Sequence, residues 1–247
     1  MNDVDQVIYG INSVFAAINH SPERIVTLWV DQSRRDSRIT ELIDTAQHQN
    51  VTVTLASREE IDRHAGNNKH QGIAALCSLP SAMSEKAFLR MLEDLNEPAF
   101  LLILDQVKDP HNLGACLRTA EAAGVHAVIT PKDNSAGLTP TVCKVASGAA
   151  SRIPLVEVTN LSRFIKHLQE AGVWIMGTSG EGEETIYQSD LKGPLAIVLG
   201  AEGSGLRRLT KTRCDKMLRI PMADPAESLN VSVAAGVILF EAVRQRP

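Results

Sequence analysis

The sequence predicts an α/β protein, with a small amino-terminal α/β unit followed by a larger domain built on a parallel sheet. Two observations predict this fold. After Pro98, continuous apolar runs alternate with helical patterns, which is typical of parallel strands buried under helices on both faces. Before residue 79, shorter strand-like and helical segments form a unit of their own. A chain of 247 residues has room for both cores.

In the first unit, residues 24–30, 51–56 and 71–78 have the pattern of strands. Residues 37–50 have apolar residues at helical spacing. Ser57 followed by Glu60 is a capping-box pattern, which predicts a short helix after the second of these strands. We therefore expect a domain over residues 1–78. The next segment, residues 79–98, lies between Pro80 and Pro98 and is expected to be a linker with at least one helical turn.

The second domain is expected to span residues 99–247. Its predicted strands cover residues 99–105, 126–130, 173–180, 195–205 and 216–222, and its predicted helices cover 112–124, about 140–150, 164–172 and the chain end. In open parallel sheets, ligands bind beyond the carboxyl ends of the strands. Three of these strand ends carry unusual polar or glycine-rich segments, so the site is expected there.

Composition excludes several classes of protein. No apolar run approaches the ~20 residues that a membrane-spanning helix needs. The acidic start, "MNDVDQVIYG", lacks the basic region of a secretory signal, so we expect a cytoplasmic protein without a membrane partner. The four cysteines, at 77, 116, 143 and 214, have no Cys-x-x-Cys spacing, and the seven histidines are scattered. This pattern predicts neither a metal site nor disulfides.

The first strand-end segment is "DPHNLGACLRTAEAAG". Asn112 lies where the N-cap of a helix is expected, so capping explains it without any other role. Helical spacing places Asn112 on one face with Cys116 and Thr119, and Arg118 lies near the edge of that face. A surface arginine is the structural alternative to a functional one at position 118.

The second segment, "VLGAEGSGL", places Glu202 among Gly200, Gly203 and Gly205. Glycines after a strand allow backbone to approach a ligand closely. Their spacing matches neither the dinucleotide fingerprint nor the P-loop. The following residues, 205–219, hold six basic side chains against one acid, although the whole chain has a net charge of −4. This run is either a solvated helix face or a surface for RNA phosphates. Its proposed RNA contacts are Arg207, Arg208, Lys211 and Arg213.

The third segment, "ADPAESLNVSVAAG", opens the last helix with the polar residues Glu227, Ser228 and Asn230. A helix cap explains Ser228 fully. Asn230 is expected in the first helical turn, where an amide is an unfavourable choice, and this indicates a functional role.

These three segments, in this order, resemble the motifs of the SPOUT superfamily of methyltransferases. The resemblance covers residues 99–247 and is to the SpoU (TrmH) branch, whose members are RNA ribose 2′-O-methyltransferases. The front unit, with "IYGINSVFAAI" and "HQGIAA", is similar to the L30e-like substrate-binding domain of members that modify a specific guanosine in 23S ribosomal RNA. The resemblance implies a carboxyl-terminal trefoil knot, S-adenosyl-L-methionine as methyl donor, 23S rRNA or its assembly precursor as substrate, and a homodimer that buries the apolar last helix.

The resemblance also implies roles for individual residues. It implies cofactor contacts, mostly through backbone atoms, at Gly200, Ile220 and Leu229. It assigns catalytic roles to Asn112, Arg118, Glu202, Ser228 and Asn230. Arginine has been proposed as the base in this family, but a guanidinium stays protonated. We therefore favour Arg118 as the anchor for the phosphate beside the reacting ribose.

Three other functions stay open at this stage. The same chemistry on transfer RNA is the nearest. The second is a catalytically inactive RNA-binding protein with the same knot. The presence of Gly200, Glu202 and Asn230 together argues against it, because an inactive relative has little reason to keep all three. A nucleotide-dependent oxidoreductase is the third, and the absent dinucleotide fingerprint makes it a poor match.

Overall fold

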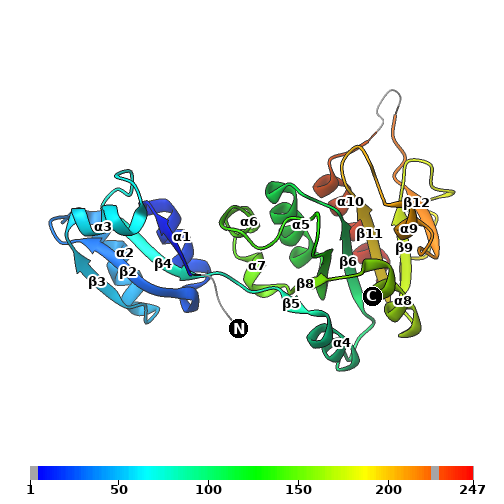
Figure 1. Ribbon diagram of the computed structural model, residues 1–247, viewed down its shortest axis with the longest axis horizontal. Helices are drawn as coiled ribbons and strands as arrows, with labels where there is room; N and C mark the ends of the chain where they lie inside the picture. Colours follow the sequence, from blue (N-terminus) through cyan, green and yellow to red (C-terminus); the bar gives the residue numbers. More distant parts are fainter. Residues whose placement is uncertain (1–4, 224–227, 247) are drawn as a thin grey trace. The chain divides into compact units, whose positions relative to one another are not determined.

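The computed structural model describes residues 5–223 and 228–246. The chain divides into two compact units, Met1–Ser81 and Ala82–Pro247 (Figure 1). Each unit has its own hydrophobic core, and the two are described separately below.

The first unit is a mixed four-stranded sheet in the order β1-β4-β2-β3. Strands β2 and β3 are parallel, and β4 runs antiparallel to both β1 and β2. Ser57 caps the third helix by accepting a hydrogen bond from the Glu60 backbone N–H, as the capping pattern predicts. The elements are β1 (Asp5–Tyr9), α1 (Ile11–His20), η1 (Pro22–Arg24), β2 (Ile25–Asp31), α2 (Ser37–His48), β3 (Val53–Ala56), α3 (Arg58–Ala65) and β4 (Ile73–Ser78).

The second unit is built on an eight-stranded sheet in which every pair is parallel, in the order β10-β12-β9-β11-β6-β7-β8-β5. Its strands are β5 (Met83–Ser84), β6 (Phe100–Asp105), β7 (Ala127–Pro131), β8 (Leu155–Val158), β9 (Trp174–Thr178), β10 (Glu184–Thr185), β11 (Leu195–Gly200) and β12 (Lys216–Arg219). Its helices are α4 (Glu85–Glu93), α5 (Pro110–Ala122), α6 (Pro140–Ala146), α7 (Ala149–Arg152), α8 (Leu161–Glu170), α9 (Arg208–Lys211) and α10 (Val231–Gln245).

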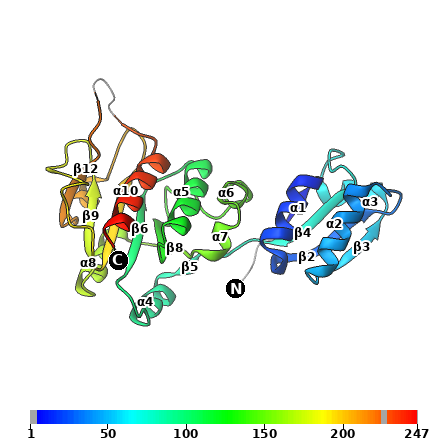
Figure 2. The ribbon, with the colours of Figure 1, turned by 180° about the vertical axis from the view of Figure 1, so that it is seen from behind.

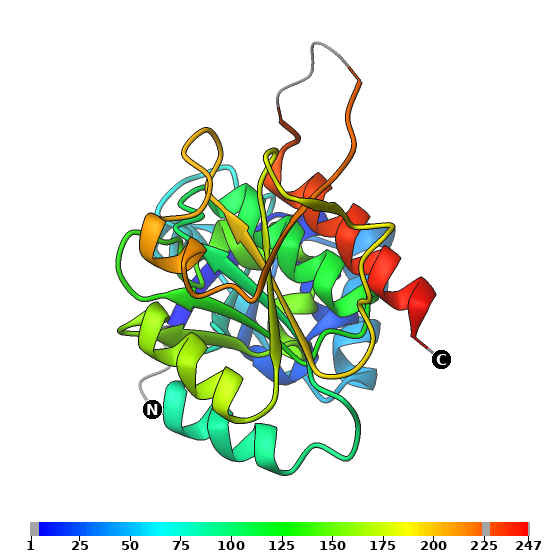
Figure 3. The same ribbon diagram turned by 90° about the vertical axis from the view of Figure 1, so that its right-hand side faces the viewer.

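Helices cover both faces of this sheet, as the continuous apolar strands predict (Figures 2 and 3). One core packs α5, α6, α7 and α10 against the side chains of Leu102 and Leu104 on β6. The other packs α4 and α8 against Leu101 and Ile103, the alternate residues of the same strand. Successive side chains of a strand point to opposite faces, so β6 contributes to both cores.

The segment expected to be a linker, residues 79–98, belongs in large part to the second unit. Met83–Ser84 pairs with Val156–Glu157 as the edge strand β5, and Phe88 on α4 is fully buried in the sheet core. The two prolines therefore bracket an integral strand and helix rather than a free connection.

The last two elements of the chain contact different parts of the sheet. Strand β12 pairs with β9 on the side away from β11. Helix α10 packs on α5 and β11.

Candidate active site

A cavity of about 500 Å³ lies where the loops after β9, β11 and β12 meet the first turns of α10. This is the edge of the sheet at which parallel α/β folds bind ligands. Its size lies within the ~300–1,000 Å³ range of small-molecule sites. The residues around it are Thr178–Glu181, Leu199–Leu206, Lys211, Met217, Leu218, Ile220, Met222, Ser228, Leu229, Val231, Ala234 and Ile238.

Three polar side chains from three distant segments form one hydrogen-bonded cluster beside this cavity. Asn112 Nδ2 donates to Glu202 Oε1 at 3.0 Å. Asn230 Nδ2 donates to Asn112 Oδ1 at 2.9 Å and to the same Glu202 oxygen at 2.6 Å. Residues 112, 202 and 230 therefore lie together in space, as predicted for three segments that follow strands of one parallel sheet. Both amides orient the Glu202 carboxylate.

The capping residues differ from those expected. Helix α5 begins earlier than predicted, at Pro110, and Asp109 is its N-cap. Asn112 is therefore inside the first turn and buried, which leaves its amide for the cluster. Asn230 caps α10, and its Oδ1 accepts hydrogen bonds from the Ser232 N–H at 2.9 Å and hydroxyl at 2.6 Å. Ser228 does not cap α10 but lies on the cavity wall.

The turn after β11 depends on glycine. A Cβ on Gly200 would lie 2.1 Å from the carbonyl carbon of Gly205, a distance that no side chain can tolerate. Gly203 and Gly205 have φ of +77° and +63°, which L-residues rarely adopt. The turn closes on itself through the Gly205 N–H and the Ala201 carbonyl. It presents backbone atoms to the cavity.

All three predicted cofactor positions, Gly200, Ile220 and Leu229, lie on the cavity wall. Sequence reasoning missed the loop after β9, residues 178–181, although the glycine-containing turn "GTSG" after an apolar strand is the same signal as in the second segment. It also assigned Lys211 only to RNA. Lys211 borders the cavity and lies 3.8 Å from Glu181.

Arg118 lies outside the cluster. It is exposed on α5, it does not border the cavity, and its side chain makes no hydrogen bond or ion pair with the described residues. It is six residues, about 9 Å along the helix axis, beyond Asn112. Within one chain, the structure therefore does not bring Arg118 to the polar cluster.

The basic run is not uniform. Arg207 binds Asp105, a fully buried carboxylate at the end of β6, through Nε at 2.7 Å and through its backbone N–H at 3.1 Å. It holds the turn after β11 in place, and because its side chain is 41% exposed, its role in RNA binding stays a prediction. Arg213 Nε donates to the Ser162 hydroxyl at 3.2 Å. Arg208 is exposed and makes no side-chain hydrogen bond or ion pair within the described part of the chain.

Comparison with known proteins identifies the family. A family model described as SpoU rRNA methylase matches residues 99–240. The chain belongs to the SpoU rRNA methylase family. A second model, described as RNA 2′-O ribose methyltransferase substrate binding, matches residues 7–83. The resemblance predicted from the three segments is thereby confirmed.

Curated relatives of this SpoU chain are similar over nearly its whole length. The 23S rRNA (guanosine-2′-O-)-methyltransferase RlmB of Shewanella oneidensis is 54% identical over 240 residues, which is 97% of each chain. The protein of the same name from Escherichia coli K12 is 50% identical over 243 residues, covering 98% of this chain and 100% of that relative.

Solved structures confirm the α/β fold. The SpoU methyltransferase AviRb from Streptomyces viridochromogenes, solved with its cofactor AdoMet, superposes with a TM-score of 0.73 at 24% identity and covers 98% of this chain and 90% of that one. The TrmH/SpoU tRNA modifying enzyme of A. aeolicus has a TM-score of 0.55 at 29% identity and covers 65% of this chain and 83% of that one.

The described residues of this SpoU chain offer neither a metal site nor a membrane-spanning helix. Within residues 5–223 and 228–246, no three His, Cys, Asp or Glu side chains are grouped so that they could hold a metal ion. No helix in this part of the chain is long and apolar enough to cross a membrane.

Burial raises the pKa of Cys116 to about 12, so this thiol stays protonated at neutral pH. Glu227, predicted at the entrance of the last helix, lies outside the described residues.

Proposed function

We propose that this protein transfers the methyl group of S-adenosyl-L-methionine to the ribose 2′-hydroxyl of a guanosine in 23S rRNA. The observation that carries the proposal is the convergence of Asn112, Glu202 and Asn230 beside a cavity formed by the glycine turn. The relatives named for this reaction, 54% and 50% identical, support the substrate.

The cavity residues fit the cofactor. Leu199, Ile220 and Leu229 offer apolar contact for an adenine ring, and the backbone of the glycine turn offers hydrogen-bond groups close to a ligand. Glu181 and Glu202 supply negative charge suited to a cationic sulfonium and amino group. When bound, S-adenosylmethionine supplies an electrophilic methyl group, and no covalent bond to the protein is required.

The protein's part in the reaction is then alignment. Holding the ribose oxygen in line with the methyl carbon is worth about 7–11 kcal/mol of the barrier. The cluster of Asn112, Glu202 and Asn230 can orient the ribose through oxygen and N–H groups that are not used in its internal hydrogen bonds. Ser228, on the wall of the same cavity, is placed to bind either the ribose or the methionine end. Removal of the hydroxyl proton contributes a further factor of about 10²–10⁴.

We infer that Arg118 acts in a homodimer. Helix α10 presents the exposed apolar side chains Val233 (50% exposed) and Phe240 (49% exposed), seven residues apart on one stripe. A second copy covering this stripe would bury it. Arg118 is a free cation on α5, the helix against which α10 packs. It could then reach the partner's polar cluster and grip the phosphate next to the reacting ribose. An oxygen of that phosphate, rather than the protonated guanidinium, would receive the hydroxyl proton.

The remaining roles follow from this reaction. We propose that residues 1–78 bind rRNA and that Arg208, Lys211 and Arg213 contact RNA phosphates beside the cavity. We expect the carboxyl-terminal part of the chain to form the trefoil knot that the resemblance implies. A protein that modifies 23S rRNA or its assembly precursor is expected to work in the cytoplasm, where ribosomes are assembled.

The test uses the purified full chain, S-adenosylmethionine with a labelled methyl group, and rRNA from cells that lack this protein. We expect one methylated guanosine in 23S rRNA, located by resistance of the adjacent phosphodiester to alkaline cleavage. Transfer RNA in a parallel reaction should stay unlabelled. Labelled transfer RNA with unlabelled rRNA would overturn the substrate. Cofactor binding without transfer to either RNA would favour the catalytically inactive RNA-binding protein.

A further inference from the structure

One edge of the sheet in the first unit gathers loops from all four strands. Strand register puts Asp31, at the end of β2, opposite Ala56, at the end of β3. Val30 lies opposite Ile73, at the start of β4, and Tyr9, at the end of β1, lies opposite Ala74. Loops 32–36 and 66–72 therefore leave the same edge, which we call the loop edge.

Basic side chains gather at the loop edge although the unit as a whole is acidic. Among its seven arginines and lysines, three lie in these loops, Arg34, Arg35 and Lys69, and a fourth, Arg58, follows the end of β3 at the same edge. Asp31 is buried, and its Oδ1 accepts hydrogen bonds from the Ser33 N–H and hydroxyl. The Ser33 hydroxyl lowers the pKa of Asp31, and the positive charges of Arg58 and Arg34 contribute to that shift.

Two of these cations are available to a ligand. Arg35 is exposed, and its only side-chain hydrogen bond with the described residues is donated to the Arg34 carbonyl at 3.3 Å. Lys69 is exposed and makes no side-chain hydrogen bond or ion pair with them. Glu59 and Glu60 follow Arg58 in the first turn of α3, so the positive charge is concentrated on the two loops. The opposite edge carries Asp5 and Glu23 against Arg24.

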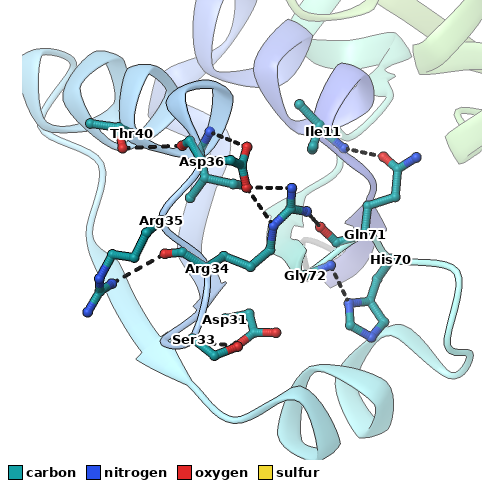
Figure 4. Close-up of polar contacts among 11 residues, drawn as sticks. Ile11, Asp31, Ser33, Arg34, Arg35, Asp36, Thr40, His70, Gln71 and Gly72 are labelled. Atoms are coloured by element: carbon teal, nitrogen blue, oxygen red, sulfur yellow. Dashed lines mark hydrogen bonds and ion pairs between the residues drawn. The ribbon is translucent and has the colours of Figure 1, made fainter.

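The two loops are fixed to each other (Figure 4). The Arg34 guanidinium binds both the Asp36 carboxylate and the Gln71 carbonyl, and the Gln71 side chain accepts a hydrogen bond from the Ile11 N–H at 3.1 Å. His70 is fully buried. Its Nδ1 accepts from the Gly72 N–H at 3.1 Å, so its Nε2 carries the proton that faces Asp62 at 2.8 Å.

The backbone is also in an unusual conformation where Arg34 meets loop 66–72. Gln71 has φ of +56°, an uncommon value for a residue other than glycine, and Gly72 follows at +74°. A Cβ on Gly72 would lie 2.6 Å from the Arg34 side chain, so glycine is what allows the arginine to cross between the loops. Conformational strain of this kind is maintained by surrounding contacts and is concentrated at functional sites.

The loop edge also carries an aromatic ring. Tyr9 is one of two tyrosines in the chain and is 40% exposed. Exposed aromatic rings beside cations are the combination that binds unpaired RNA, since bases stack on the ring while cations contact phosphates.

Asn67 fixes the backbone at Lys69. Its side-chain oxygen Oδ1 accepts a hydrogen bond from the Lys69 N–H at 2.9 Å.

We propose that the loop edge is the surface by which the first unit binds an unpaired segment of its RNA substrate. Arg35 and Lys69 contact phosphates, and Tyr9 stacks on a base. Arg34, Gln71 and His70 are positioning residues that hold the two loops at the required spacing. This proposal rests on the proposed function, because it places the RNA contact of the same methyltransferase.

The test compares two charge-matched double variants of the full chain. R35Q with K69Q removes one arginine and one lysine from the loop edge. K86Q with R90Q removes the same pair from α4, where both side chains are exposed and make no hydrogen bond or ion pair with the described residues. Binding to in vitro transcribed 23S rRNA is measured by filter retention over a range of salt concentrations. Loss of two phosphate contacts should reduce the salt slope by about 1.4–1.8 for the loop-edge variant only.

A second variant tests the ring. Y9L keeps an apolar side chain but removes the aromatic face, and loss of one stacked base should weaken binding by about 5- to 150-fold without changing the salt slope. All variants should bind S-adenosylmethionine as the parent does, and the loss in methylation should appear in KM for RNA rather than in kcat. Equal slopes for the two double variants, with a parent that methylates rRNA, would overturn this proposal and leave the proposed function standing. A parent that does not methylate rRNA would overturn the proposed function instead.

Discussion

Replacing Arg207 by alanine should destabilise the second unit and weaken cofactor binding, whereas the same change at the neighbouring Arg208 should do neither. Arg207 joins the turn after β11 to the buried carboxylate of Asp105 at the end of β6. Without the guanidinium, Asp105 stays in a fully buried position and loses the only cation with which it forms an ion pair in the described part of the chain. The turn that forms one wall of the cavity loses an anchor at the same time.

The magnitude follows from the geometry of this pair. A hydrogen bond to a charged group contributes about 1.5–3 kcal/mol. Removing one partner of a buried ion pair costs about 3–5 kcal/mol. The Arg207 side chain is 41% exposed, and its backbone N–H still reaches Asp105 in the variant, so both effects are reduced by solvent and by the remaining bond. We expect a loss of about 2–3 kcal/mol, or about 4–12 °C in Tm for a unit of this size.

Differential scanning calorimetry of R207A and R208A measures the difference in stability between the two variants. R208A is the matched control, because the two arginines are adjacent and both are exposed to solvent. Calorimetric titration with S-adenosylmethionine measures the second effect, which should appear as a higher Kd for R207A alone. D105N combined with R207A should destabilise less than the sum of the single changes, since they remove one interaction. Equal Tm values for R207A and R208A, with equally reduced salt slopes for RNA binding, would show that Arg207 is a phosphate contact and that the pair contributes little.

Three further predictions follow from the site and from α10. R118A should leave the Kd for S-adenosylmethionine unchanged in calorimetry while it abolishes methyl transfer; lost cofactor binding would make Arg118 a structural residue. G200A should abolish cofactor binding because its Cβ would overlap the Gly205 backbone, whereas G236A, whose Cβ meets Thr119 at an ordinary 3.8 Å, should bind normally. Hydrogen bonds from Arg244 and then Gln245 lower the pKa of Glu241 from 4.5 to about 2. Its contribution to stability is therefore complete above about pH 4.5 and lost as the pH falls towards 2, and E241Q should flatten the dependence of Tm on pH in that window. An unchanged slope in E241Q would assign the acid sensitivity to other carboxylates.

Most strands and helices of the second unit could be predicted because their patterns are local. The apolar run of β6 and the alternate packing of its side chains follow from one short stretch of sequence. The helix N-termini were harder to place. Asn112 and Ser228 are both good capping residues, but Asp109 and Asn230 cap the helices in their place, and the competing side chains have similar intrinsic preferences. Contacts from distant segments decide between them.

The segment between Pro80 and Pro98 shows the same limit on a larger scale. Its composition resembles that of a linker, and its short strand has only two residues. Its place at the sheet edge depends on pairing with β8, some seventy residues later, and on a cavity in the core that Phe88 fills. Neither partner can be identified from the local pattern.

The amino-acid sequence by itself determined the fold class, and the order of three segments that resemble one family determined the reaction family. Because those segments follow strands of one parallel sheet, the sequence also predicted that Asn112, Glu202 and Asn230 lie close together. Only the tertiary structure decided which cations are free. Arg207, Arg208 and Arg118 are indistinguishable as residues, yet one is held by a buried aspartate, one is open to solvent, and one lies away from the polar cluster of its own chain. A charge acts through the distance to its partners and the solvent around it, and both are set by contacts between segments far apart in the chain.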